Sequence, residues 1–483
     1  MRWHLLNSFD TIYILDLHGN SQKKEVCPDG SPDKNIFDIQ AGVSINIFIK
    51  TGKKAKGQLA KVFHTEFWGT REYKYDQLLK GRIENTSFEE VAFSAPYYFF
   101  KPKDDTGRNQ YETGFKITDL FPNNVTGIVT MGDNFIIADS KEELMDRISD
   151  FLAVDYTEDE LKIKYSLGKN YAKWILANKQ KIKSAHLKYI QIDYRPFDKK
   201  WTIFDNNLIW RWRHDTMKHF LGGDNIGLMT CRQAAVDSWD LVGVTKLVAD
   251  DSRVSNRSRE RGYIFPLYLY PQSTDQQTLG VNIERKPNLN SEIVGKISSG
   301  LNIQFASEKK VTEGETFTPE DLLHYIYAIL HSPTYRKTYK EFLKIDFPRI
   351  PYPSDIKLFR QLVKLGAELR TLHLMESLTL ENYITSYPVN GDNKVTRKIV
   401  AKDWELVDFK SGRVWINDHQ YFDGIPVSVW EFYIGGYQPA QKWLKDRSGS
   451  ELSYENILHY QKIIVALSET DRLIKAIDLI KVD

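Results

Sequence analysis

The sequence predicts a multidomain α+β protein. Its 483 residues exceed what one ordinary hydrophobic core holds, so we expect two to four domains. Apolar, β-branched runs open the chain, short strand signals alternate with turns between residues 190 and 310, and helical periodicity, first seen between residues 140 and 185, returns at residue 318. Strand and helix signals therefore dominate different stretches of the chain.

Two apolar runs mark the first region, residues 1–56. "TIYILDL" (residues 11–17) and "NIFDIQAGVSINIFIK" (residues 35–50) are nearly continuous in apolar residues, which is typical of strands covered on both faces. The segment between them is rich in Gly, Pro, Lys and Asp, and we expect an exposed loop there. "TGKKAKG" (residues 51–57) then breaks the pattern and predicts the first domain boundary.

The second predicted region, residues 57–185, is a connecting α/β segment. Strand signals mix with loops up to about residue 135, and three helices follow. The first, "SKEELMDRISDFLA", opens with a capping box formed by Ser140 and Glu143. "TEDELKIKYSL" and "NYAKWILANKQ" predict the second and third helices.

Two further regions complete the chain. Residues 186–316 are expected to form a β-rich subdomain, because runs such as "YIQIDYRPFD" and "LVGVTKLVA" are separated by turns. Residues 317–483 are expected to be helical with a few strands, and Thr318 followed by Pro319 is a strong helix start. Within them the prolines of "IDFPRIPYP" predict an extended crossing between helices, which we expect Arg349 to fix.

Composition excludes several classes of protein. Lys+Arg 66 against Asp+Glu 64 gives a formal charge of +2, so any nucleic-acid surface must come from local clustering. Two cysteines exclude a disulfide scaffold and a Cys-rich zinc module, and they fit a reducing cytosol. The sequence has no apolar run of membrane-spanning length and no signal peptide, so we expect a cytoplasmic protein without membrane contact.

Catalytic motifs are absent from the sequence. No two glycines lie two positions apart, so there is no dinucleotide-binding fingerprint. Gly52 and Gly57 have the spacing of a phosphate-binding loop, but Gln58 stands where the lysine is needed. His214 and His219 lack a metalloprotease pattern, and no nuclease site is evident. We therefore predict no catalytic residue and no metal ligand.

Clustered arginines are the strongest functional signal. "DSRVSNRSRERG" places four arginines within nine positions, and "WRWRHDTMKHF" interleaves cations with aromatic residues. Guanidinium groups bind phosphates or guanine, and Asn256 suits an adenine edge, whereas Lys199 and Lys200 suit phosphate. The alternatives are a solvated charged loop and, for the second stretch, cation–π packing on a β surface. The arginine candidates for DNA contact are Arg211, Arg213, Arg232, Arg253, Arg257, Arg259 and Arg261.

Three long stretches carry a resemblance to a known family. "SFDTIYILDLHGNSQKKEVCPDGSPDKNIFDIQAGVSINIFIK" resembles the closing segment of the catalytic domain in N6-adenine DNA methyltransferases that are fused into restriction–modification enzymes. "YRPFDKKWTIFDNNLIWRWRHDTMKHFL" and "FTPEDLLHYIYAILHSPTYRKTYKEFLKIDFPRIPYP" resemble the target-recognition region that follows it. The resemblance is to type ISP enzymes and extends over nearly the whole chain, including "YQPAQKWLKDRSGSELSYENILHYQKIIVAL".

The resemblance implies an architecture of which this sequence carries only some parts. Residues 1–56 correspond to the end of the methyltransferase domain, and Phe37 matches the aromatic residue that packs against the flipped adenine. Core packing is the alternative for Phe37. Complete family enzymes use S-adenosylmethionine, but this sequence has no Pro-Pro dipeptide of the catalytic pocket and no glycine-rich cofactor loop. The nuclease and motor segments are missing too.

The resemblance predicts sequence-specific recognition of double-stranded DNA, with the chain serving as the specificity region of an enzyme of phage defence. The chain alone is expected to bind no cofactor and to be inactive without a catalytic methyltransferase and motor portion, supplied in cis or in trans. The alternative is one half of a split adenine methyltransferase, active only with a separately encoded catalytic partner. An aromatic-rich β protein that binds carbohydrate or another protein is a third possibility.

Overall fold

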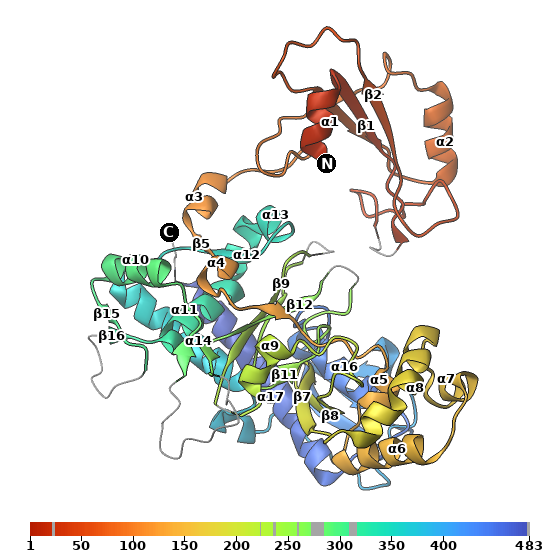
Figure 1. Cartoon of the computed structure of the whole chain (residues 1–483), viewed down its shortest axis with the longest axis vertical. Helices are drawn as coiled ribbons and strands as arrows, with labels where there is room; N and C mark the ends of the chain where they lie inside the picture. The colour runs from red at the N-terminus through yellow and green to blue at the C-terminus, as the bar shows by residue number, and fades with distance from the viewer. Residues whose placement is uncertain are drawn as a thin grey trace. The chain divides into compact units, whose positions relative to one another are not determined.

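The computed structural model describes residues 1–21, 25–222, 224–234, 238–257, 260–271, 285–308 and 316–480. The chain divides into two compact units, Met1–Thr106 and Gly107–Asp483 (Figure 1). This division differs from the four predicted regions, since it falls well beyond residue 56. Within the described residues, helices and small sheets occur in both units, which confirms a mixed α+β fold. No described helix has the length and apolar character that a membrane span requires.

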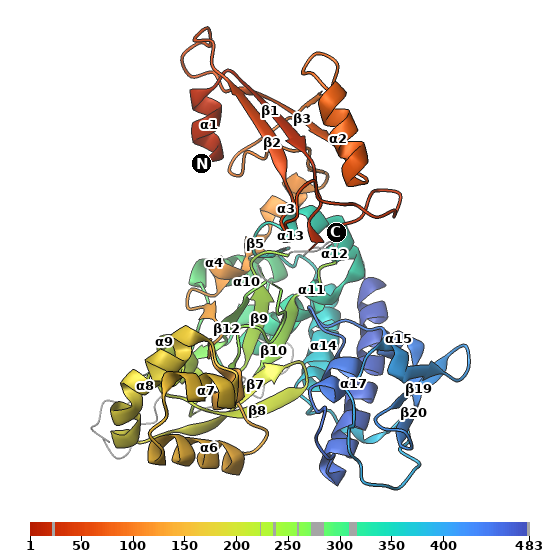
Figure 2. The same ribbon diagram turned by 90° about the vertical axis from the view of Figure 1, so that its right-hand side faces the viewer.

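The first unit is built on one four-stranded sheet with the strand order β2-β1-β3-β4. Strand β1 runs antiparallel to β2 and parallel to β3, so β3 belongs to the same sheet as the first 56 residues. The two described helices of this unit, α1 (Arg2–Ser8) and α2 (Arg71–Lys80), pack on opposite sides of the sheet (Figure 2). The elements are α1 (Arg2–Ser8), β1 (Thr11–Asp16), β2 (Ser44–Ile49), β3 (Lys61–Glu66), α2 (Arg71–Lys80) and β4 (Glu89–Glu90).

The apolar run of residues 35–50 differs from its prediction as a strand covered on both faces. Only Ser44–Ile49 form a strand, and its first five residues are exposed. The reason is its place in the sheet: β2 lies at the edge and pairs only with β1 among the described strands. Its exposed apolar side chains include Ile45, Ile47 and Phe48. An apolar sequence therefore marks a surface here, and not a core.

A buried ion pair holds the long loop between β1 and β2. The Lys74 Nζ lies 2.6 Å from the Asp33 Oδ1, and both side chains are fully buried. Lys74 also donates to the carbonyl oxygens of Leu17 and Lys34, at 2.8 and 2.7 Å. The Asp33 carboxylate in turn accepts from the N–H of Gly19. Helix α2 therefore joins the start of this loop to its middle through one lysine.

The second unit contains the remaining helices of the described chain. They are α3 (Arg108–Thr113), α4 (Ile117–Leu120), α5 (Asp133–Ile136), α6 (Lys141–Ala153), α7 (Glu158–Tyr165), α8 (Lys169–Ser184), α9 (His214–Met217), η2 (Lys218–Phe220), α10 (Ser291–Leu301), α11 (Pro319–His331), α12 (Pro333–Thr338), α13 (Lys340–Leu343), α14 (Ile356–His373), η3 (Leu378–Glu381), η4 (Ala401–Asp403), α15 (Val427–Trp430), α16 (Pro439–Lys445) and α17 (Tyr454–Asp478).

The strands of the second unit form several small sheets. One has the order β10-β9-β12-β6 and another the order β11-β7-β8, and both lie between the helices α6–α8 and the helices α11, α14 and α17 (Figures 1 and 2). The strands are β5 (Phe115–Lys116), β6 (Val125–Thr126), β7 (Tyr189–Arg195), β8 (Asp198–Ile203), β9 (Gly227–Cys231), β10 (Val242–Thr245), β11 (Val248–Ala249), β12 (Gly262–Pro266), β13 (Tyr268–Leu269), β14 (Lys286–Pro287), β15 (Gln304–Phe305), β16 (Thr316–Phe317), β17 (Arg349–Ile350), β18 (Trp404–Leu406), β19 (Ser411–Trp415) and β20 (Tyr421–Pro426).

Helix starts follow the capping signals in the sequence. Ser140 accepts from the N–H of Glu143 and begins α6, as expected. Thr318 forms a capping box with Asp321, and Pro319 is the first residue of α11. Helix α11 is buried nearly all round and contacts α14 closely, since a Cβ at Gly366 would lie 1.9 Å from the His324 carbonyl oxygen.

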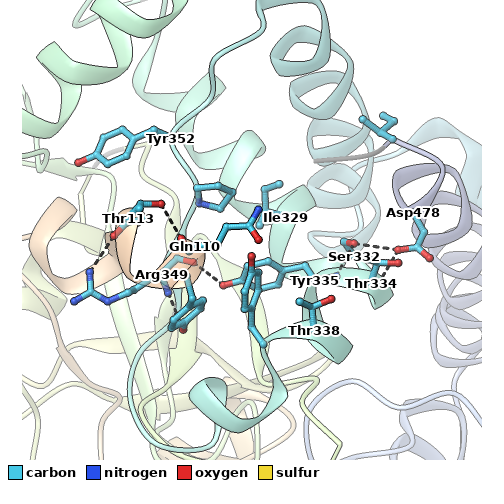
Figure 3. Close-up of a pocket in the computed structure, with 15 residues that line it drawn as sticks. Gln110, Thr113, Ile329, Ser332, Thr334, Tyr335, Thr338, Arg349, Tyr352 and Asp478 are labelled. Carbon is cyan, nitrogen blue, oxygen red and sulfur yellow. Dashed lines mark hydrogen bonds between the residues drawn. The ribbon is translucent and has the colours of Figure 1, made fainter. Parts of the chain in front are cut away.

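The predicted extended crossing is confirmed as strand β17, which pairs with β5. The Arg349 guanidinium donates to the carbonyl oxygen of Gly114 at 2.9 Å, and the Arg349 carbonyl accepts from the Tyr335 hydroxyl at 2.7 Å. These contacts line a hollow of about 640 Å³ (Figure 3). Arg349 therefore has the structural role that the sequence predicts.

Replacing Lys74 tests the support of the loop between β1 and β2. In Lys74→Ala, Asp33 stays buried without its cation, so we expect the local stability to fall by about 3–5 kcal/mol. Hydrogen–deuterium exchange of the full chain measures this loss in peptides from β1 and α2. Lys80→Ala is the control, because it removes an exposed ion pair with Asp76 on the same helix. Equal exchange in the two variants would contradict a special role for Lys74.

Candidate nucleic-acid interface

One end of the β10-β9-β12-β6 sheet collects loops that carry arginines. Strand β9 ends at Cys231 and β12 begins at Gly262, and these two residues are direct partners in the antiparallel register. Arg232 and Arg261, the next residues outward, therefore lie at the same end of the sheet. We call residues 211, 231–234, 250–257 and 260–261 the arginine end.

A single backbone segment brings Arg211 to this end. The N–H of Gly127 donates to the Gly262 carbonyl at 2.9 Å, and two residues later Val129 and Arg211 exchange backbone hydrogen bonds of 3.1 and 3.0 Å. The approach is close, because a Cβ at Gly127 would lie 2.4 Å from the nitrogen of Asp251. A glycine is thus required where this segment crosses the loop formed by residues 250–257 and 260–261, which we call the arginine loop.

Several of the candidate side chains at the arginine end reach solvent. Arg232 and Arg261 are 59% and 57% exposed, and Arg211 and Asn256 are exposed as well. Arg232 lies 3.2 Å from Asp346, and Arg261 pairs with Asp251. A guanidinium has five N–H donors, so one carboxylate partner leaves donors free for phosphates or base edges.

The structure removes Arg253 and Lys200 as candidates for DNA contact. Arg253 is only 3% exposed, and its Nε donates to Asp193 at 3.0 Å. Lys200 is also buried and pairs with Asp139. A cation in the interior is retained where carboxylates pair with it, and the local sequence does not reveal those partners. Both residues therefore stabilise the fold.

The remaining candidates lie in different environments. Arg257 is partly exposed, with its guanidinium 4.0 Å from Glu260. Arg213 is half-buried and precedes α9 with a positive φ of 54°. Lys199 is exposed and pairs with Asp193 in the β7–β8 register, on a cavity of about 980 Å³ that His459 and Arg447 also line. Arg259 lies outside the described residues.

Buried ion pairs beneath the arginine end were missed by sequence reasoning. Arg195 on β7 donates to Asp250 at 2.7 Å, and its guanidinium stacks 3.7 Å above the Tyr194 ring. Burial raises the pKa of Asp250 to about 6, which the charge of Arg195 opposes. Burial likewise raises the pKa of Asp193, against the charge of Arg253. Charged residues at alternate positions of an otherwise apolar strand were the available signal.

A turn from the C-terminal part of the chain supports the arginine loop from another side. The N–H of Gly436 donates to the Val254 carbonyl at 2.9 Å, and the Tyr437 hydroxyl donates to the Ser252 carbonyl at 2.6 Å. Within the loop, the Ser255 hydroxyl donates to buried Glu260 at 2.5 Å. The described residues of this loop, 250–257 and 260–261, therefore have a fixed backbone, while outer side chains such as Arg261 extend into solvent.

Phe37 lies in the first unit, on the loop that Lys74 holds. Its ring is 51% exposed, which excludes core packing. Its N–H donates to the Asn35 side chain at 2.9 Å, and Arg71 donates to the carbonyl oxygens of both residues. An exposed aromatic ring on a fixed backbone is suited to stacking, and contact with a flipped base stays a prediction.

The raised pKa of Asp250 predicts a pH effect on folding. Because the folded state binds this proton more tightly than the unfolded state does, the contribution of Asp250 to stability is present at pH 3.8 and lost as the pH rises through 6. Asp250→Asn should remove this dependence, which amounts to about 3 kcal/mol. Urea unfolding at pH 4 and pH 7, followed by tryptophan fluorescence, compares the variant with the parent chain. If the free energy of unfolding changed with pH by the same amount in the variant and in the parent chain, the predicted role of Asp250 would be contradicted.

Comparison with solved structures shows the same fold in proteins that were solved in complex with DNA or a DNA mimic. The DNA-bound, ATP-dependent Type ISP restriction–modification enzyme LlaBIII is 19% identical with a TM-score of 0.72, over 100% of this chain and 32% of that one. The DrdV–DNA complex is 18% identical with a TM-score of 0.70, over 98% and 48%. A nuclease-deletion mutant of the Type ISP enzyme LlaGI, in complex with a DNA substrate mimic, is 18% identical with a TM-score of 0.67, over 98% and 37%.

The chain spans about a third to a half of the length of these enzymes. No curated protein sequence matches it. The family model described as the Type ISP C-terminal specificity domain matches residues 119–476, which include the whole arginine end. The chain therefore belongs to the Type ISP C-terminal specificity domain family.

Proposed function

We propose that this chain recognises a specific sequence of double-stranded DNA, as the specificity region of a Type ISP restriction–modification enzyme. The observation that carries the proposal is the arginine end, where side chains from separate parts of the sequence reach solvent at one end of the β10-β9-β12-β6 sheet. Family membership supports it, as does the shared fold with enzymes whose structures contain DNA.

The arginine end has the chemistry that base and phosphate recognition needs. Arg232 and Arg261 offer planar forks of donors, which match phosphate oxygens or the O6 and N7 atoms of guanine. Asn256 is exposed in the same loop as Arg261 and suits the N6 and N7 atoms of adenine. Because buried ion pairs and the turn at Gly436 fix the loop backbone, little conformational entropy is lost on binding.

The first unit is proposed to complete the methyltransferase part of such an enzyme. In this proposal S-adenosylmethionine binds the catalytic portion and not this chain alone, and Phe37 stacks on the flipped adenine. The chain then directs methylation and restriction, and serves phage defence, by choosing the DNA site. The exposed edge strand β2, with apolar Ile45 and Ile47, offers a place where a neighbouring strand can extend the sheet.

That exposed edge also favours a second candidate, half of a split adenine methyltransferase. A separately encoded catalytic partner would then pair with β2 and supply the cofactor pocket. The two candidates share the same role in DNA recognition. They differ in whether the catalytic portion is joined to the chain or associates with it.

Arginine replacements test DNA recognition directly. The chain should enrich one site from a random duplex library and bind it with an affinity that falls steeply with salt. Arg232→Ala and Arg261→Ala should each weaken binding by about 1–3 kcal/mol, or reduce the salt slope by about 1 if the contact is to phosphate. Fluorescence anisotropy across a salt series measures both quantities.

The matched control is Arg472→Ala. Arg472 is 58% exposed and lies on α17 beside Glu469, outside the arginine end. It should bind DNA as the parent chain does. If the library returned no enriched site, or if Arg232→Ala and Arg261→Ala both bound like the parent chain, the proposal would be abandoned.

Mixing experiments test the methyltransferase half of the proposal. The chain alone should show no heat of binding with S-adenosylmethionine and transfer no methyl group to DNA. Adding the catalytic portion of a Type ISP enzyme as a separate polypeptide should restore transfer if association in trans suffices. Ile47→Lys on β2 should then abolish the restored activity without affecting DNA binding. Methylation by the unmixed chain would contradict the assignment of the catalytic pocket to the partner.

A further inference from the structure

Two pairs of polar residues, each pair spaced by two positions, meet at the end of the inner strands β1 and β3 in the first unit. Asp16 ends β1 and Glu66 ends β3, and these residues are direct partners in the parallel register. His64 precedes Glu66 by two positions, so the period of two places all three side chains on one face of the sheet. His18 follows Asp16 by the same interval. The sequence signals are "DLH" and "HTE", neither of which is a known motif.

The ligand-type atoms of this group lie close together. One oxygen or nitrogen from each of Asp16, His64 and Glu66 lies within 4.8 Å of the others. The Nε2 of His64 is 3.9 Å from Glu66, which is too far for a hydrogen bond. His18 lies between the carboxylates, 3.8 Å from Asp16 and 3.6 Å from Glu66.

The histidines present buried nitrogen atoms without partners. His64 is 4% exposed and His18 is 6% exposed, and the Nε2 atom of each has no hydrogen-bond partner. A buried polar atom left unpaired is costly and calls for an explanation. Both Nε2 atoms lie nearest the Glu66 carboxylate, so the unpaired atoms face the same point as the acids.

The remaining contacts orient this group without completing it. The N–H of His18 donates to Asp16 at 3.1 Å, and the Trp68 indole donates to Glu66 at 3.1 Å. The His18 ring stacks on Trp68 with centroids 3.3 Å apart. Trp68 and the backbone therefore hold two of these side chains in place, as second-sphere groups hold metal ligands.

We propose that Asp16, His64 and Glu66 bind a divalent transition-metal ion, with Zn²⁺ the best match, and that His18 positions the two carboxylates. Two carboxylates and an imidazole form a mixed oxygen and nitrogen set, which suits Zn²⁺ better than Mg²⁺ or Ca²⁺. Bonds of about 2.0–2.2 Å place ligand atoms roughly 3.3 Å apart, so the most distant pair of the group must approach by up to about 1.5 Å when an ion binds. Glu66 interacts most strongly with His18 and Trp68 and more weakly with exposed Lys101, whose single charge the two acids outweigh.

Bound metal would join the ends of two parallel strands at the start of the loop that carries Phe37. His18 is the second residue after β1, and the buried pair of Lys74 and Asp33 holds the same loop further along. The ion would therefore stabilise a loop whose backbone positions an exposed aromatic ring. This role is independent of the DNA contacts proposed for the second unit.

Metal titration of the full chain tests the site. After treatment with a chelator, the chain should bind one equivalent of Zn²⁺ in competition with a chromophoric chelator. Co²⁺ should replace it and give the visible absorption bands of a tetrahedral site. His64→Gln and Glu66→Gln should each weaken binding by about 100-fold, and His18→Gln by about 10-fold.

His214→Gln is the matched control, because His214 lies 3.8 Å from a single carboxylate, that of Asp215, and should leave binding unchanged. Glu66 is partly exposed, so Glu66→Gln tests the site even if the replacement of buried His64 prevents folding. Absence of stoichiometric binding by the parent chain would overturn the proposal. Binding that survives in both His64→Gln and Glu66→Gln would do so too, since the ion would then lie elsewhere.

Discussion

The arginine end depends on two carboxylates that the fold keeps out of water. Asp193 and Asp250 lie in or beside neighbouring strands, where the N–H of Asp250 donates to the Asp193 carbonyl at 3.1 Å. Each carboxylate is paired with an arginine, Arg253 or Arg195, from another strand or loop. Loss of either arginine would leave a buried charge, so these pairs fix the loop geometry more strictly than apolar packing would.

This constraint divides the arginines of one short loop between two tasks. Arg253 points inward and holds the loop to β7, whereas Arg261 lies at its outer end in solvent. The turn that contains Gly436 holds the loop from the C-terminal part of the chain. Under the proposed function, recognition and structural support occupy adjacent positions of the same segment, and they are separated by the direction of each side chain.

Local signals predicted the helices well, and the family resemblance predicted the class of the protein. Ser140 and Thr318 began helices because caps act within a few residues. Such local signals could not predict that Arg253 and Lys200 are buried, because their partners Asp193 and Asp139 lie 60 and 61 residues away in the sequence. The exposed face of β2 was not predicted for a related reason. An apolar sequence indicates that a strand is suited to burial, but it does not indicate whether the same chain or another one buries it.

The separation of inner and outer arginines has a consequence for how such proteins diversify. Substitutions at Arg232, Asn256 or Arg261 change side chains that face solvent, while the pairs at Asp193 and Asp250 keep the loop backbone in place. Under the proposed function, single replacements at Arg232 or Asn256 change the target preference with little effect on the folding free energy, whereas replacing Arg261 also leaves the buried carboxylate of Asp251 without its partner. The same scaffold allows drift among outer residues and purifying selection among inner ones, and that contrast is the evolutionary signature expected of this loop.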